Sequence, residues 1–241
     1  MTRRRFIADT WTSTTATLTG DQATHLARVL RAEPGQIFDV VAGGFLHRAE
    51  ITSAHEEEVL FTLHEELESD AALPLHLLLA VFKFDHMEWA IEKATELGVS
   101  RITPILARRT EKHLALAANK RAERWRRIVL EASKQSRRTT IPEIADPIQL
   151  KSALEQEQSP TRILLSETEQ ATTITTALTA ALATSETTDV ALAIGPEGGW
   201  TPEEMAIFTT HNWQPVTLGP RILRAETAAL AAIAIASTHL A

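Results

Sequence analysis

From residue 75 onward, the chain alternates between short apolar segments and longer segments with the periodicity of amphipathic helices. The apolar segments have the length of strands, and the first of them, Leu75–Phe82, is apolar enough to be buried on both faces. Strands are predicted at residues 75–82, 101–107, 162–166, 190–195 and 216–219, and helices at 85–98, 119–135, 171–183, from 201 onward and at the end of the chain. Such an alternation predicts an α/β fold with a mainly parallel sheet between helices.

Local signals refine the helices of this half. Thr201-Pro202-Glu203-Glu204 combines a capping hydroxyl, a first-turn proline and a reciprocal glutamate, which predicts a helix start. Asp85 followed by Glu88 resembles a second capping box, and Gly98 is expected to end that helix. Apolar side chains expected in the core are Trp89, Trp125, Ile128, Val129, Ala132 and Trp213. The last helix is so apolar that we expect it to be buried within the fold or between two copies of the chain.

The first seventy residues are typical of a small β-barrel with one helix. Strands are predicted at 36–42, 45–52 and 59–67, and Gly43-Gly44 indicates a hairpin between the first two. Asp21 is expected to cap a helix that turns Leu26, Val29 and Leu30 to one face and that ends at Glu33-Pro34-Gly35. The charged residues 65–70 and the following Ala71–Pro74 are the candidate linker, so we predict domains at 1–70 and 74–241.

Charge is distributed unevenly along the chain. The net charge is −7, yet residues 101–138 contain twelve Lys and Arg against three Glu, while residues 139–210 contain eleven acidic residues against two basic ones. A concentrated basic stripe attracts phosphate whatever the overall charge, although a solvated helix face has the same composition. Cysteine is absent, which excludes disulfides and thiolate sites. No apolar run approaches the length of a membrane helix and no signal peptide is recognisable, so we expect a cytoplasmic protein.

Three predicted strands of the α/β half end in loops that carry Gly or Ser. These loops begin at Leu165-Ser166-Glu167, at Gly195-Pro196-Glu197-Gly198-Gly199 and at Leu218-Gly219-Pro220-Arg221. Ligands of open α/β sheets bind beyond the carboxyl ends of the strands, and glycine allows close approach of the backbone, although each glycine alone could simply mark a turn. No phosphate-loop motif occurs, and a carboxylate within the glycine loop would repel phosphate. A cationic or neutral ligand is therefore favoured.

These loops carry a family resemblance. The segments ALAIGPEGGWTPEEM and LGPRILRAETAAL resemble the SPOUT-class methyltransferases, and more narrowly the family that methylates N3 of a uridine in 16S ribosomal RNA. Further similar segments are His25–Arg31, Ile91–Val99 and Trp125–Arg138 followed by Ile141–Ile144, so the resemblance spans nearly the whole chain in the same order. Phe84 and His86 depart from the small, basic stretch usual near Lys83, which leaves the substrate contacts there open.

The resemblance implies a PUA-like RNA-binding barrel followed by a SPOUT domain whose C-terminal segment forms a trefoil knot, acting as a homodimer. It also implies S-adenosylmethionine as the cofactor, bent within the knot. The residues that would bind this cofactor are Leu165, Ser166, Glu167, Ile194, Gly195, Pro196, Glu197, Gly198, Gly199, Leu218, Gly219, Ile222, Leu223 and Thr227.

The chemistry of such an enzyme assigns further residues. N3 of uracil lies on the pairing edge, so the base must be unpaired or flipped out, and N3 must lose its proton before it attacks a methyl group. Arg224 is the candidate for stabilising the uracil anion, and Glu226 is either a proton acceptor or a carboxylate that favours the helix dipole. Candidates for RNA contacts are Arg5, His25, Arg28, Arg31, Lys83, Arg108, Arg109 and Arg138, of which His25 could instead cap a helix.

Two other functions stay open at this stage. A SPOUT enzyme could methylate a ribose 2′-hydroxyl or another base, and a chain with a decayed pocket could be a non-catalytic RNA-binding assembly factor. Intact glycine loops disfavour the second alternative. The nine histidines show no ligand spacing, so no metal is expected.

Overall fold

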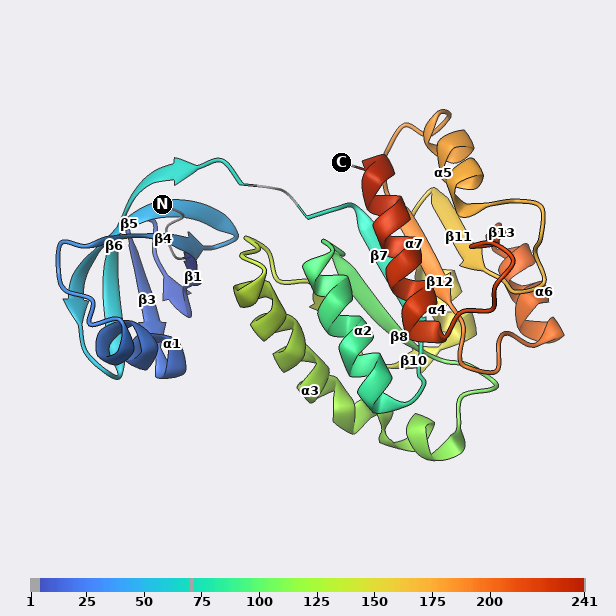
Figure 1. Ribbon diagram of the computed structural model, residues 1–241, viewed down its shortest axis with the longest axis horizontal. Coiled ribbons are helices and arrows are strands. Elements are labelled where there is room, and N and C mark those ends of the chain that lie inside the picture. Colours follow the sequence, from blue (N-terminus) through green and yellow to red (C-terminus); the bar gives the residue numbers. More distant parts are fainter. Residues whose placement is uncertain (1–4, 70–71, 241) are drawn as a thin grey trace. The chain divides into compact units, whose positions relative to one another are not determined.

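The computed structural model describes residues 5–69 and 72–240, which divide into two compact units. The first unit comprises the residues up to 71 together with 133–140, and the second comprises 72–132 and 141 onward. Figure 1 shows strands with one short helical segment in the first unit and a sheet flanked by helices in the second. Of the predicted linker, Asp70 and Ala71 lie outside the described residues, and residues 65–67 belong to a strand instead.

The first unit is built on a curled six-stranded sheet with the order β1-β4-β5-β6-β3-β2. All neighbours in it are antiparallel except β1 and β4. Gly43 and Gly44 both have positive φ, as a tight hairpin between β4 and β5 requires, so the predicted turn is confirmed. The strands are β1 Arg5–Ile7, β2 Thr10–Trp11, β3 Thr15–Thr19, β4 Ile37–Ala42, β5 Phe45–Ala54 and β6 Glu58–Leu67.

The helical segment of this unit differs from the prediction. It consists of α1 Gly20–Thr24 and a π-helical turn, η1 His25–Val29, in which the N–H of Leu30 donates to the carbonyl of His25. The wider π turn rotates Val29 off the inner face, leaving it 64% exposed while Leu26 is buried. The prediction for Val29 is therefore wrong. Asp21 is not the cap either, because the helix starts after Thr19 and Asp21 lies in its first turn.

The second unit contains a sheet in which every pairing is parallel, with the order β10-β8-β7-β12-β11-β13 and β9 beside β8. The predicted α/β class, with a parallel sheet behind a small β-domain, is confirmed. The strands are β7 Leu75–Ala80, β8 Arg101–Leu106, β9 Glu143–Ile144, β10 Ile148–Gln149, β11 Thr161–Leu165, β12 Val190–Ile194 and β13 Gln214–Val216.

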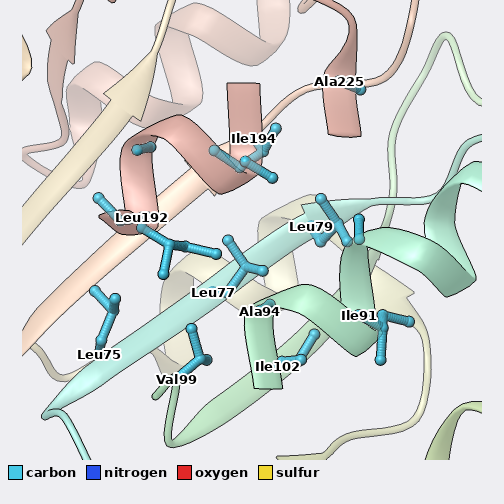
Figure 2. Close-up of a cluster of buried hydrophobic side chains, with 14 of the residues drawn as sticks. Leu75, Leu77, Leu79, Ile91, Ala94, Val99, Ile102, Leu192, Ile194 and Ala225 are labelled. Carbon is cyan, nitrogen blue, oxygen red and sulfur yellow. The ribbon is translucent and has the colours of Figure 1, made fainter. Parts of the chain in front are cut away.

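Helices cover both faces of this sheet, and alternate side chains of its central strands serve the two faces. Leu75, Leu77 and Leu79 of β7 join Leu192 and Ile194 of β12 in one core, as Figure 2 shows. The residues between them, such as Leu78, Ala191 and Ala193, belong to the core on the opposite face. The first core is covered by α2 Phe84–Glu96, α3 Lys112–Gln135, α5 Ile174–Leu182 and α7 Ala225–Leu240, and the second by α4 Leu150–Gln156 and α6 Pro202–Thr210.

The end of the chain returns from the sheet edge to its centre. β13 is the edge strand, whereas α7, which follows it, packs against α2, α5 and β12 (Figure 1). Ala229, Ala232, Ile233 and Ala236 are buried there, so packing within the chain accounts for the buried face of this helix. The predicted knot would be formed by this return and stays a prediction.

Two predictions about α2 are wrong. The helix starts directly after Lys83, so Asp85 lies in its first turn rather than at its cap, and Glu88 instead forms ion pairs with Arg121 and Arg124. Trp89 is 46% exposed, whereas Trp125 and Trp213 are buried as predicted. The capping box of Thr201 and Glu204 is confirmed in both directions. The described part of the chain has no helix that is both long and apolar enough to cross a membrane.

Candidate functional site

A cavity of about 1020 Å³ lies in the second unit, where the carboxyl ends of its strands meet. Because parallel strands end at one edge of the sheet, the loops after β11, β12 and β13 converge there. Lys83 and His86, at the start of α2, also line the cavity, as do Thr173, Met205 and Ala228. The three loops contribute residues 165–170, 194–200 except Gly198, and 216–225.

Most of the residues predicted to bind the cofactor share this cavity. Every member of that set lines it except Gly198 and Thr227. Thr227 is exposed on α7, and Gly198 lies at the crest of the glycine loop, beside the side chain of Arg109. The lining residues that the sequence reasoning did not single out include Thr168, Gln170, Thr173, Trp200, Met205 and Thr217.

The glycines of the loops are required for close approach. A Cβ at Gly195 would lie 3.1 Å from Nε1 of Trp200, and a Cβ at Gly199 would lie 2.8 Å from Oε1 of Glu167. Gly199 and Gly219 also have φ of +71° and +110°, a conformation that L side chains rarely adopt. Trp200 packs against Phe208 with 4.8 Å between ring centroids, and its Nε1 is buried without a hydrogen-bond partner in the described structure. The glycine loop therefore has a defined shape before any ligand binds.

The loop after β8 holds the glycine loop in place. The guanidinium of Arg109 donates to the carbonyl oxygen of Gly198, and the backbone N–H of Arg108 donates to Oε1 of Glu204 over 2.7 Å. The other oxygen of Glu204 accepts from the N–H of Thr201 over 2.9 Å, at the start of α6. Arg109 thus contacts the glycine loop itself, and sequence spacing gave no sign of it because the two residues are 89 positions apart.

Carboxylates line the β11 and β12 sides of the cavity. Glu167, Glu169 and Glu197 all contribute to it, and Nζ of Lys83 lies 3.8 Å from Oε2 of Glu197. The backbone N–H groups of Thr172 and Ala171 hold the pKa of Glu169 below its ordinary value. This charge favours a cationic or neutral ligand on that side, as the sequence predicted.

The two predicted catalytic residues differ in position. Arg224 lines the cavity and is exposed, and its guanidinium makes no hydrogen bond or ion pair with any described residue. Glu226 does not line the cavity: it is buried in the first turn of α7, with Oε1 3.3 Å from Nδ1 of His86 and with Oε2 lacking a hydrogen-bond partner among the described residues. His86, which does line the cavity, thus lies next to the buried carboxylate.

The residues predicted to contact RNA are divided between the units. Arg5, His25, Arg28 and Arg31 belong to the first unit, where the last three are exposed. Lys83, Arg108 and Arg109 belong to the second. Nε of Arg138 donates to the carbonyl oxygen of Thr140 over 3.1 Å, and burial lowers the pKa of Arg138 to about 10. RNA contacts by this set stay a prediction.

Fold and cavity agree with comparisons to known families. A model described as an RNA methyltransferase domain matches residues 69–237, and one described as an RNA methyltransferase PUA domain matches residues 18–63. The class defined by the parallel sheet, its three loops and the preceding β-domain is therefore that of the RNA methyltransferases.

Individual relatives narrow this class. The ribosomal RNA small subunit methyltransferase E of Synechocystis is 38% identical over 225 residues, covering 91% of this chain and 72% of the relative. The Bacillus subtilis protein of the same name is 31% identical, covering 92% and 90%. The Neisseria gonorrhoeae enzyme, solved bound to S-adenosyl methionine, is 31% identical with a TM-score of 0.81 over 98% of both chains. The chain belongs to the ribosomal RNA small subunit methyltransferase E family.

Proposed function

We propose that this protein transfers a methyl group from S-adenosylmethionine to N3 of a uridine in the 16S ribosomal RNA of the small ribosomal subunit. The observation that carries the proposal is the convergence of three loops on one cavity, with the unpaired guanidinium of Arg224 at its lining. Family membership supports cofactor-dependent methylation of ribosomal RNA, and the resemblance described above supports N3 of uridine as the acceptor.

The cavity fits S-adenosylmethionine. Solved relatives from Neisseria gonorrhoeae and Legionella pneumophila contain this cofactor, the second with a TM-score of 0.79 at 28% identity. Leu165, Leu218 and Leu223 offer apolar contacts for an adenine ring, and the carboxylates of Glu167, Glu169 and Glu197 suit ribose hydroxyls or a positive sulfur. Glycines at 195, 199 and 219 let the backbone approach a ligand where a side chain would intrude. When bound, the cofactor supplies an electrophilic methyl group on a sulfonium centre.

Arg224 stabilises the acceptor base. Loss of the N3 proton leaves negative charge delocalised over uracil, and an unpaired guanidinium donates to such an anion without first breaking another bond. Placement of the base beside the methyl group supplies much of the remaining rate. Glu226 keeps the second role predicted for it, as a carboxylate in the first turn of α7, where the helix dipole favours negative charge.

The first unit binds the RNA in this proposal. Its match to a PUA domain supports this role, and its exposed cations Arg28 and Arg31 are suited to phosphate contacts. Arg5, His25, Lys83, Arg108, Arg109 and Arg138 complete the proposed set. Binding should then weaken steeply with salt. A homodimer is part of the same proposal, as the resemblance implies, and the exposed Trp89 on α2 offers apolar surface for it.

Product analysis tests the proposal. The protein is incubated with labelled S-adenosylmethionine and small subunits that lack the modification, and the labelled nucleoside is identified by mass spectrometry. N3-methyluridine is the expected product. A 2′-O-methylated nucleoside or a different methylated base would contradict the assignment to N3, and cofactor binding without any methyl transfer would instead indicate a non-catalytic assembly factor.

A further inference from the structure

His86 lies between the cavity and the buried carboxylate of Glu226. Its side chain lines the cavity, and its Nδ1 is 3.3 Å from Oε1 of Glu226 on α7. Its Nε2 has only the exposed carboxylate of Asp85 nearby, at 3.7 Å, which is too long for a hydrogen bond. Thus one ring nitrogen faces a buried carboxylate while the other has no hydrogen-bond partner among the described residues.

The carboxylate of Glu226 is placed to orient the imidazole of His86. Its side chain is 10% exposed, and its Oε2 has no hydrogen-bond partner within the described part of the chain. A carboxylate beside Nδ1 favours the tautomer with the proton on that nitrogen, which leaves a lone pair on Nε2. The 3.3 Å approach is a charge contact that is not yet aligned as a hydrogen bond, because Nδ1 also lacks a hydrogen-bond partner there. Catalytic contacts are often loose before the substrate binds.

We infer that His86 is the proton acceptor for N3 of the target uridine and that Glu226 is its positioning residue. The inference rests on the proposed function, since it is N3 chemistry that requires a base. The N3 proton moves to Nε2 of His86, and N3 then uses its lone pair to form a bond to the methyl carbon. The electron pair of the broken carbon–sulfur bond stays on sulfur, and the imidazolium is balanced by the carboxylate of Glu226.

The charges around His86 suit this role. Arg224, two residues before Glu226, lines the same cavity and stabilises the uracil anion while His86 removes the proton. Lys83 on the neighbouring turn is paired with Glu197 of the glycine loop, and Asp85 is exposed to solvent. Glu226 is thus the one carboxylate that is both buried and in contact with His86 among the described residues. An imidazolium formed in the reaction therefore gains a buried counter-charge.

The test compares two substrates for His86→Gln. Small subunits are reconstituted from transcribed ribosomal RNA that contains either uridine or 5-fluorouridine, whose N3 proton is more acidic. Loss of a general base slows the step by about 10²–10⁴-fold. We expect a loss of at least about 100-fold in single-turnover rate with uridine, and a loss several-fold smaller with 5-fluorouridine, because an acidic N3 needs less help from a base.

Matched variants separate this role from a structural one. His113→Gln changes another histidine that lies 3.6 Å from a glutamate, Glu111, outside the cavity, and it should keep the native rates. Glu226→Gln should slow transfer less than His86→Gln does. Calorimetry should show unchanged affinity of His86→Gln for S-adenosylmethionine, which confirms that the cavity is intact.

Each outcome is decisive. If His86→Gln lost the same factor in single-turnover rate with both substrates, His86 would have only a structural role. If this variant kept the native rate, His86 would take no part in the reaction. Either result overturns the inference. Failure of the proposed function is distinguishable, because the native chain itself would then give neither N3-methyluridine from the uridine substrate nor N3-methyl-5-fluorouridine from the fluorinated one.

Discussion

Two histidine–glutamate pairs of the second unit, His76–Glu157 and His86–Glu226, lie at opposite ends of β7, and their surroundings differ. His76 lies near the start of β7, where Nδ1 contacts Oε2 of Glu157 and Nε2 lies 2.8 Å from the hydroxyl of Thr103. Glu157 also accepts from the N–H of Ser159 over 2.7 Å. His86, beyond the other end of β7, has one glutamate contact and leaves Nε2 without a hydrogen-bond partner among the described residues.

The two histidine–glutamate pairs also differ in how deeply their side chains are buried. The side chains of His76 and Glu157 are 13% and 4% exposed, whereas those of His86 and Glu226 are 33% and 10% exposed. A buried ion pair with further hydrogen-bond partners contributes to stability. A pair in which one ring nitrogen faces a cavity without a hydrogen-bond partner is able to react. The contrast supports our proposal that the amino-terminal edge of this sheet stabilises the fold while its carboxyl-terminal edge carries the reaction.

The largest expected effect is at the cavity. Replacing Arg224 with Ala should lower the rate of methyl transfer by about 10²–10³-fold, the usual cost of removing a donor to a developing anion. The temperature of unfolding and the affinity for S-adenosylmethionine should stay unchanged, because the guanidinium of Arg224 makes no hydrogen bond or ion pair with the described residues. Single-turnover kinetics on small subunits measure this rate, with Lys151→Ala on α4 as a control. Full activity of Arg224→Ala would refute the role.

The second expected effect is on stability and concerns the buried pair of His76 and Glu157. Burial alone would raise the pKa of Glu157, but the contact and charge of His76 and the hydrogen bonds of Ser159 outweigh it and hold the pKa at about 2. Glu157 therefore stabilises the fold when ionised, fully above its ordinary pKa of 4.5, and this stabilisation is lost as the pH falls towards about 2. The difference between the ordinary pKa of 4.5 and the pKa of about 2 in the folded protein corresponds to roughly 3 kcal/mol in the free energy of unfolding.

Denaturant unfolding of the native chain and of Glu157→Gln across this pH range measures that contribution. The variant should be less stable at neutral pH and should lose less stability on acidification. Glu155→Gln, which changes an exposed glutamate two residues earlier on α4, is the control. If native and Glu157→Gln lost the same free energy of unfolding between pH 4.5 and pH 2, the buried pair would not be the stabilising element.

A smaller effect is expected for Arg109→Ala. Without the guanidinium that donates to Gly198, the glycine loop loses one tether, and the affinity for S-adenosylmethionine should fall about tenfold, equivalent to roughly 1.4 kcal/mol for a hydrogen bond to a charged donor. Calorimetry measures the affinity, and Arg127→Ala on α3 controls for the loss of a surface cation. If Arg109→Ala bound S-adenosylmethionine with native affinity but bound RNA more weakly, Arg109 would be an RNA contact and not a tether of the glycine loop.

The smallest effect sharpens the contrast between the two carboxylates. Glu226→Gln should change the free energy of unfolding by no more than about 0.5 kcal/mol, because the carboxylate of Glu226 accepts no hydrogen bond from the described residues, whereas Oε1 of Glu157 accepts from the N–H of Ser159 over 2.7 Å. The same substitution at Glu157 should be clearly destabilising. Thermal unfolding measures both variants. Comparable losses of stability for Glu226→Gln and Glu157→Gln would contradict the expected difference between the two carboxylates.

The strands and the three cavity loops could be predicted because their signals are local. Continuous apolar runs mark β7 and β12, and ligands of parallel sheets bind at the carboxyl ends of the strands, which brings Leu165 and Leu218 together. By contrast, β9 and β10 have two residues each, too few to show a period, and their pairing depends on β8.

Other features depend on tertiary contacts. The contacts of Arg109 with Gly198 and of His86 with Glu226 join residues far apart in the chain. No spacing rule predicts such pairs. The sequence therefore indicated where a ligand binds but not which side chains hold the loops in place.

We propose that the loops after β11, β12 and β13 form one binding site for S-adenosylmethionine, and titration calorimetry measures this binding. The native chain should bind one cofactor per chain, and Leu165→Ala, Gly195→Val and Leu218→Ala, one from each loop, should each weaken that same binding. Absence of binding to the native chain, or binding that is indifferent to one of these loops in a folded variant, would contradict the claim.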